Sequence, residues 1–145
     1  MLHYTDCGLR NVWLRNGYVE RDTPYGRALA IQDVEGLHRA IGRFLVGDKP
    51  GLLSGEEVRF LRKELDLSQA RLAEIMGFDP QSVAKWEKNG APKWADRMLR
   101  AIYREHADGN AAIVAMVERL QLAEGAPTER LELEESGSGW HPVAA

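Results

Sequence analysis

The chain has 145 residues, of which 44% are hydrophobic and 28% charged, with a formal net charge of −3. This composition is ordinary for a soluble globular protein, and no apolar run approaches the roughly 20 residues that a membrane-spanning helix needs. The single cysteine, Cys7, excludes an internal disulfide, and residues 1–6 lack a signal-peptide pattern. We therefore expect a cytoplasmic protein with no membrane partner.

The negative charge is concentrated near the C-terminus. Residues 1–53 carry 7 basic and 6 acidic residues, residues 54–106 carry 10 and 9, and residues 107–145 carry 2 and 7. A near-neutral domain can bind nucleic acid if its cations gather on one face, which sequence alone does not show. The net charge neither supports nor excludes such a partner.

The first part of the chain, residues 1–50, is typical of a small β-unit followed by one helix. Asn16-Gly17, between the candidate strands at residues 12–15 and 18–19, favours a type I′ turn and predicts a hairpin. Residues 25–31 are the candidate third strand. Asp33 is the predicted N-cap of a helix whose apolar residues recur at helical spacing: Val34, Leu37, Ile41, Phe44 and Leu45. Residues 47–51 then break this pattern and indicate a linker.

Residues 51–124 are predicted to form an all-α domain of five helices. Ser54 and Glu57 match a capping box at the start of the first helix, and Ser68 is the predicted cap of the second. Gly77 ends the second helix because glycine tolerates a left-handed backbone. Asp79 is the predicted N-cap of the third helix, which spans roughly residues 80–88 with Pro80 first.

Two further helices and a tail complete the predicted α+β fold. The apolar patterns place helices at residues 94–105 and 112–122. Residues 125–145 are acidic and then rich in glycine and serine, which predicts a flexible acidic tail. The last helix contributes either to the intrachain core or to a dimer seam, of which we favour the dimer.

The polar positions of the third helix point to DNA. Val83 and Trp86 face the core, which leaves Gln81, Ser82, Lys85 and Lys88 on the outer side. Glutamine can bond adenine through two atoms, and lysine can reach guanine acceptors or phosphate, as a helix in the major groove requires. The alternative is an ordinary solvated helix face.

Residues 54–104 resemble the helix-turn-helix of the phage-repressor (Cro/C1, or XRE) family, through Leu-Ser-Gln-x2-Leu-Ala at residues 67–73. The resemblance implies that Gln69 contacts backbone phosphate and buttresses Gln81, and that Gln81, Ser82 and Lys85 meet bases. It also implies a scaffold ion pair between Arg62 and Glu87. Pro80 departs from the family pattern, in which many members carry a polar contact residue there.

The order of the N-terminal β-unit and the helix-turn-helix is similar to that of MqsA-type antitoxins, which neutralise a toxin protein. Those proteins hold zinc with two Cys-x2-Cys pairs, whereas this chain has only Cys7. The resemblance implies a possible toxin partner for residues 1–50, without the structural zinc.

Other residues admit alternatives. Lys93, Arg97, Arg100 and Arg104 suit a solvated helix face, with phosphate contact an alternative for Lys93. His3 and Cys7 could begin a metal site, but the other histidines are scattered, so we expect no metal and no cofactor. The aromatic residues of the β-unit suit a core or interface better than a nucleobase platform. No catalytic constellation is evident, so we expect no enzyme.

The leading hypothesis is a homodimeric repressor that reads an inverted repeat in double-stranded DNA with helix 80–88. DNA-binding candidates are Gln69, Gln81, Ser82, Lys85, Lys88 and Lys93. The alternatives are an antitoxin of a type II toxin–antitoxin pair that represses its own operon, and a protein-binding adaptor without DNA binding.

Overall fold

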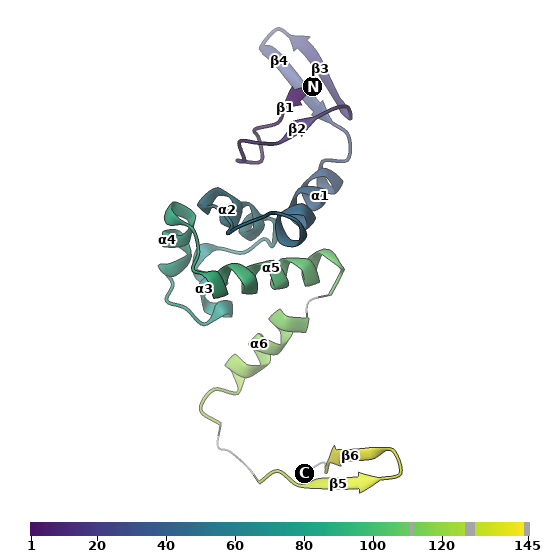
Figure 1. The fold of residues 1–145 in the computed structure, drawn as a ribbon, viewed down its shortest axis with the longest axis vertical. Helices are drawn as coiled ribbons and strands as arrows, with labels where there is room; N and C mark the ends of the chain where they lie inside the picture. Colours follow the sequence, from purple (N-terminus) through teal and green to yellow (C-terminus); the bar gives the residue numbers. More distant parts are fainter. Residues whose placement is uncertain (111, 127–129, 144–145) are drawn as a thin grey trace.

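The computed structural model describes residues 1–110, 112–126 and 130–143. A small β-unit at the N-terminal end is followed by a helical body and, at the far end, by a C-terminal hairpin (Figure 1). Within the described residues, one helix belongs to the N-terminal unit and five follow it. The predicted α+β class, with a five-helix domain after a β-unit, is therefore confirmed.

The β-unit consists of two separate antiparallel pairs. One pair joins β1 to β2 and the other joins β3 to β4; the strands are β1 (Leu2–His3), β2 (Trp13–Leu14), β3 (Tyr18–Thr23) and β4 (Gly26–Ile31). The predicted hairpin around Asn16-Gly17 is wrong, because β2 and β3 belong to different sheets. A type I′ turn needs positive φ at both central residues, and only Gly17 has it, at 81°. The predicted third strand matches β4 except at Tyr25.

Helix α1 (Val34–Gly47) connects the β-unit to the rest of the molecule. The Asp33 side chain accepts a hydrogen bond from Gly36 N at 3.2 Å, so the predicted N-cap is confirmed. Leu45 is buried in the core, whereas Phe44 and Val34 on the predicted apolar face are about half exposed. The apolar stripe of α1 is thus only partly covered within the chain.

A hydrogen-bonded chain of side chains joins the β-unit to two helices. Tyr4, which is buried, places its Oη 2.9 Å from His38 Nε2 on α1. His38 Nδ1 lies 3.3 Å from Glu64 Oε2 at the end of α2. The ring of His38 also meets the edge of Phe60. These contacts attach the N-terminal strands to the helical body.

Helices α2 to α5 enclose the hydrophobic core. They are α2 (Gly55–Glu64), α3 (Gln69–Met76), α4 (Ser82–Asn89) and α5 (Lys93–Ala107). Each contributes fully buried apolar side chains, among them Val58, Leu61, Leu72, Val83 and Leu99. Burying one such side chain stabilises the fold by roughly 1.5–3 kcal/mol, so this cluster fixes the relative positions of the four helices.

Within the helical domain, the predicted helix caps are confirmed for α2 and α3 and wrong for α4. Ser54 and Glu57 form the capping box of α2, and the Ser68 side chain accepts from Arg71 N at the start of α3. Helix α4, by contrast, begins with Gln81 at the N-cap, without a side-chain cap. Asp79 instead contributes its carbonyl, which accepts from Ser82 N at 2.9 Å. This extra turn before α4 starts the helix two residues later than predicted.

The predicted linker at residues 47–51 is fastened by side chains of the helical domain. The Arg100 guanidinium donates to the carbonyls of Lys49 and Gly51, at 3.2 and 2.6 Å. Asp96 accepts from Leu53 N at 2.6 Å and pairs with Arg100 at 2.8 Å. Lys49 in turn reaches the Glu57 carboxylate at 2.6 Å. This network holds α1 and α2 in a defined arrangement.

Helix α6 (Ala112–Leu122), with the predicted bounds, lies against α3 and α5. None of its described residues is buried, and Ile113, Val114 and Val117 are half-covered against the core. Met116 and Leu120 remain exposed. The helix therefore gives one side to the chain's own core and keeps apolar side chains on its surface.

The C-terminal segment contains a hairpin that the prediction of a flexible tail did not anticipate. β5 (Leu133–Ser136) pairs antiparallel with β6 (Gly139–Pro142) across a turn of serine and glycine. Trp140 of β6 and Leu131, which precedes β5, are largely exposed. Residues 127–129 and 144–145 of the predicted tail lie outside the described residues.

None of the described helices combines the length and apolar character needed to cross a membrane. Across residues 1–110, 112–126 and 130–143, no group of three or more His, Cys, Asp and Glu side chains is arranged to hold a metal ion.

Candidate nucleic-acid interface

A tight left-handed turn joins α3 to α4. Gly77 has φ of 80°, and its N–H donates to Glu74 O at 3.1 Å, while Phe78 N donates to Ala73 O at 2.8 Å. These two bonds form a Schellman motif, which closes a helix and turns the chain away from its axis. The turn therefore sets the steep angle at which α4 leaves α3.

Three aromatic rings brace this turn. The ring of Phe78 meets Trp86 of α4 edge-on at 4.6 Å and stacks on Trp94 of α5 at 4.5 Å. Trp86 is buried, whereas about half of Trp94 is exposed. Offset and edge-on aromatic contacts each contribute about 0.5–1.5 kcal/mol beyond area burial. The stack thus fixes α4 against the start of α5.

Helix α4 presents a polar face away from the core. Val83 is fully buried and points inward with Trp86, whereas Gln81, Lys85 and Lys88 are exposed and Ser82 is half-buried. The predicted inner and outer sides of this helix therefore coincide with its burial in the structure. Pro80, the departure from the family pattern, is exposed in the turn just before the helix.

A largely buried ion pair connects α2 to α4. The Arg62 guanidinium donates two parallel hydrogen bonds to the Glu87 carboxylate, from Nε to Oε2 and from Nη2 to Oε1, each 3.0 Å. The side chains are only 13% and 7% exposed. Arg62 also donates to Leu67 O at 3.0 Å, just before α3. The Arg62 guanidinium on α2 therefore contacts both α4 and the segment that leads into α3.

The Gln69 amide completes this network. It donates to Glu87 Oε2 at 3.1 Å, and no hydrogen bond to Gln81 is formed within the described part of the chain. Gln69 thus supports Glu87 rather than Gln81, the partner that the resemblance implied. Gln69 is the first residue of α3, and Gln81 is the N-cap residue of α4.

A glycine permits the close approach of α2 and α4. A Cβ added at Gly55, the first residue of α2, would overlap the carbonyl oxygen of Glu87. Because that obstacle is backbone, it cannot rotate aside. Gly55 therefore sets the spacing between the two helices that carry the Arg62–Glu87 pair.

The candidate cations of the interface are three exposed lysines. Lys85 and Lys88 lie on α4, and Lys93, also exposed, is the first residue of α5. Within residues 1–110, 112–126 and 130–143, none of these three lysines pairs with a carboxylate. Their ammonium groups are available to an anionic partner.

Two other arginines are committed to structure. Arg100, expected on a solvated face, is half-buried in the network with Asp96, and the i,i+4 spacing of the two residues was the available sequence signal. Arg71, which sequence reasoning did not single out, bridges α3 to Glu118 and Gln121 of α6. Arg97 and Arg104 are exposed, as expected.

Two short helices joined by a glycine turn, with the second exposing a polar face, define a helix-turn-helix motif. Residues 58–93, from within α2 to the first residue of α5, match the family described as Helix-turn-helix, of the XRE type. This family is a DNA-binding regulatory domain and not an enzyme family, so the match supports DNA binding and transcription regulation. Comparison with curated proteins and with solved structures gave no match.

Proposed function

We propose that this protein is a sequence-specific transcriptional repressor that inserts α4 into the major groove of DNA. The observation that carries the proposal is the orientation of α4: Val83 and Trp86 anchor it while Gln81, Lys85 and Lys88 face outward. Polar side chains near the start of a recognition helix are those that reach base edges. Ser82 and Gln69 are the neighbouring candidates, the first for a base and the second for phosphate.

The test begins with selection of genomic fragments bound by the purified protein, followed by a salt titration on the most enriched one. We expect an inverted repeat whose half-sites lie about one helical turn apart, and an affinity that falls steeply with salt. Fragments with no shared sequence, or no binding at all, would contradict the assignment of α4 as a recognition helix.

Two variants separate base contact from phosphate contact. Gln81→Ala should weaken operator binding by about 1–3 kcal/mol and relax specificity at one position. Lys93→Ala should weaken all sequences alike and reduce the salt dependence. Arg104→Ala is the matched control for Lys93, because Arg104 is an exposed cation on the same helix about 16 Å farther along. Equal effects of Lys93→Ala and Arg104→Ala would refute a local phosphate contact.

We further propose that the repressor acts as a homodimer through α6. The exposed side chains of Met116 and Leu120 support this assignment, since the opposite side of α6 already packs on α3 and α5. Light scattering should give a dimer for the parent chain and a monomer for Leu120→Glu. The control is Arg119→Glu, an exposed and charged neighbour on the same helix. A monomeric parent chain would disprove the dimer.

The antitoxin alternative rests on the β3–β4 hairpin. Nearly all of its side chains are exposed, and its strands pair only with each other within the described residues. An open strand edge of this kind can accept a strand from a partner protein. Co-expression with the product of the adjacent gene tests the idea, and absence of both a complex and growth rescue would exclude it.

A further inference from the structure

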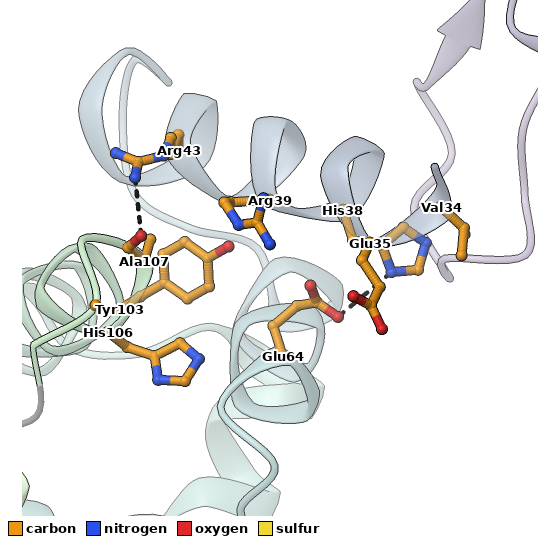
Figure 2. Close-up of a pocket in the computed structure, with 10 residues that line it drawn as sticks. Val34, Glu35, His38, Arg39, Arg43, Glu64, Tyr103, His106 and Ala107 are labelled. Carbon is orange, nitrogen blue, oxygen red and sulfur yellow. Dashed lines mark hydrogen bonds and ion pairs between the residues drawn. The ribbon is translucent and has the colours of Figure 1, made fainter. Parts of the chain in front are cut away.

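A groove of about 740 Å³ opens where α1, α2 and α5 meet (Figure 2). It lies apart from α4, and the proposed function makes no use of it. Its walls carry charged and hydroxyl-bearing side chains from three helices, including Glu35, Arg39, Glu64, Tyr103 and His106. Its volume is in the range of sites that hold small molecules, roughly 300–1,000 Å³.

Tyr103 lines this groove. The residue is 2% exposed, and no hydrogen bond to its Oη is formed among the residues that the structure describes. Gly42 of α1 makes room for it, because a Cβ at that position would overlap the Tyr103 hydroxyl. Since no buried side-chain oxygen or nitrogen among the described residues lacks a partner, the Tyr103 Oη reaches the solvent of the groove and is open to a ligand contact.

The Tyr103 hydroxyl is a donor at neutral pH. Burial raises its pKa above the ordinary value, and the negative charge of Glu64 adds to the rise. The nearby guanidinium groups of Arg43 and Arg39 lower this pKa, so two cations lie close to the hydroxyl. The protonated hydroxyl and these cations together favour an anionic acceptor.

The groove holds charged groups of both signs. Figure 2 shows Arg39 near Tyr103, Glu35 on the opposite side, and the Glu64 carboxylate between Arg39 and Glu35. Arg39 forms no ion pair within the described part of the chain, whereas Arg43 is bound to Asp108 at 2.8 Å. Glu64 likewise lies 3.3 Å from His38 Nδ1, so Arg39 and Glu35 are the groups of opposite charge that line the groove without an ion pair among the described residues, and they suit a ligand that carries both charges.

We propose that this groove binds a small zwitterion, whose carboxylate is held by the Arg39 guanidinium and the Tyr103 hydroxyl and whose ammonium group faces Glu35 and Glu64. A planar guanidinium matches the geometry of a carboxylate, and the two glutamates reject a second negative charge. A ligand with only an anionic group would leave the acidic end of the groove unpaired.

The experiment compares 4-aminobutyrate with succinate, which share a four-carbon chain and differ in the charge at one end. Binding is followed by NMR chemical shifts of α1 and α5 in the full chain without DNA, so the result does not depend on DNA binding. We expect 4-aminobutyrate to bind about tenfold more tightly or better, because a second carboxylate would face two glutamates. The perturbed residues should be those that line the groove.

Four variants locate the ligand. Arg39→Gln should weaken 4-aminobutyrate binding by about tenfold or more, and Tyr103→Phe, which removes only the hydroxyl, by a few-fold. Glu35→Gln should reduce the preference over succinate. Arg104→Gln, an exposed arginine of α5 outside the groove, should bind like the parent chain.

Three outcomes overturn the proposal. The first is succinate binding as tightly as 4-aminobutyrate, and the second is an unchanged affinity in Arg39→Gln. The third is no saturable shift with either probe up to about 50 mM, a concentration that reveals even millimolar affinity. Unchanged dispersion of the amide signals in each variant shows that the fold is intact.

Discussion

Replacing Arg62 by methionine tests whether the ion pair between α2 and α4 holds the motif together. Methionine keeps most of the apolar stem of arginine but removes both bonds to Glu87 and the bond to Leu67 O. Glu87, only 7% exposed, is then left with the Gln69 amide as its side-chain partner among the described residues. Breaking a buried pair by removing one member typically lowers stability by about 3–5 kcal/mol. Because Gln69 remains, we expect a loss near the lower limit, about 3 kcal/mol.

Urea unfolding followed by tryptophan fluorescence measures this loss, since Trp86 is buried beside the pair on the same helix. The double variant Arg62→Met/Glu87→Met should regain most of it, because no buried charge is left unpaired. The two single variants and the double variant form a cycle that gives the coupling energy directly. If Arg62→Met and Glu87→Met each lie within about 1 kcal/mol of the parent, the pair has no structural role and the reasoning is refuted.

Two further predictions concern packing and pH. Gly55→Ala should lower the unfolding free energy by about 1–3 kcal/mol and weaken DNA binding, because its Cβ would meet the Glu87 carbonyl. The control is Gly47→Ala at the end of α1, whose Cβ meets no atom and which should be neutral or slightly stabilising. Equal unfolding midpoints for the two variants would contradict the predicted overlap. Burial raises the pKa of Tyr4 and of Tyr103 above 10.0, so the folded chain holds both phenolic protons more tightly than the unfolded chain. The contribution of these two tyrosines to stability is complete below pH 10.0 and is lost as pH rises through the raised pKa values. The denaturation midpoint of the parent chain should therefore fall above pH 10.0, and that of Tyr4→Phe/Tyr103→Phe should fall less. Identical pH profiles of the two proteins would disprove this linkage.

The parts of the fold that sequence predicted well depend on local chemistry. Ser54 with Glu57, Ser68 and Gly77 act within one turn of the backbone that they satisfy, so spacing alone locates them. The inner and outer faces of α4 follow from helical periodicity in the same way. These signals need no knowledge of distant parts of the chain.

The wrong predictions depend on partners distant in sequence. Asn16-Gly17 has the local preference of a hairpin, but Trp13–Leu14 pairs with Leu2–His3, so strand pairing over the longer distance decided the outcome. Asp79 is a good cap by composition, yet the extra turn before α4 moves the start of the helix to Ser82. The β5–β6 hairpin was missed because an acidic segment with Gly and Ser has little strand propensity.

The candidate site was predictable in part. The outward positions Gln81 and Lys85 follow from periodicity, whereas the bond from Gln69 to Glu87 depends on how α3 and α4 cross. The groove that contains Tyr103 is assembled from three helices separated in the chain, and no spacing in the sequence indicates it. Sites of this kind are visible only after folding.

The network around residues 47–53 limits how the protein can be divided. A fragment that begins at Gly51 would lack Lys49, so the Glu57 carboxylate would keep the Ser54 N–H but lose its ion pair, and Arg100 would lose one of its two carbonyl contacts. The helix-turn-helix is therefore less easily combined with other sensor or effector domains than a domain that is joined by a flexible linker. A fragment that keeps the helix-turn-helix intact has to begin before Lys49. A natural fusion partner would be expected to join at the β-unit rather than between α1 and α2.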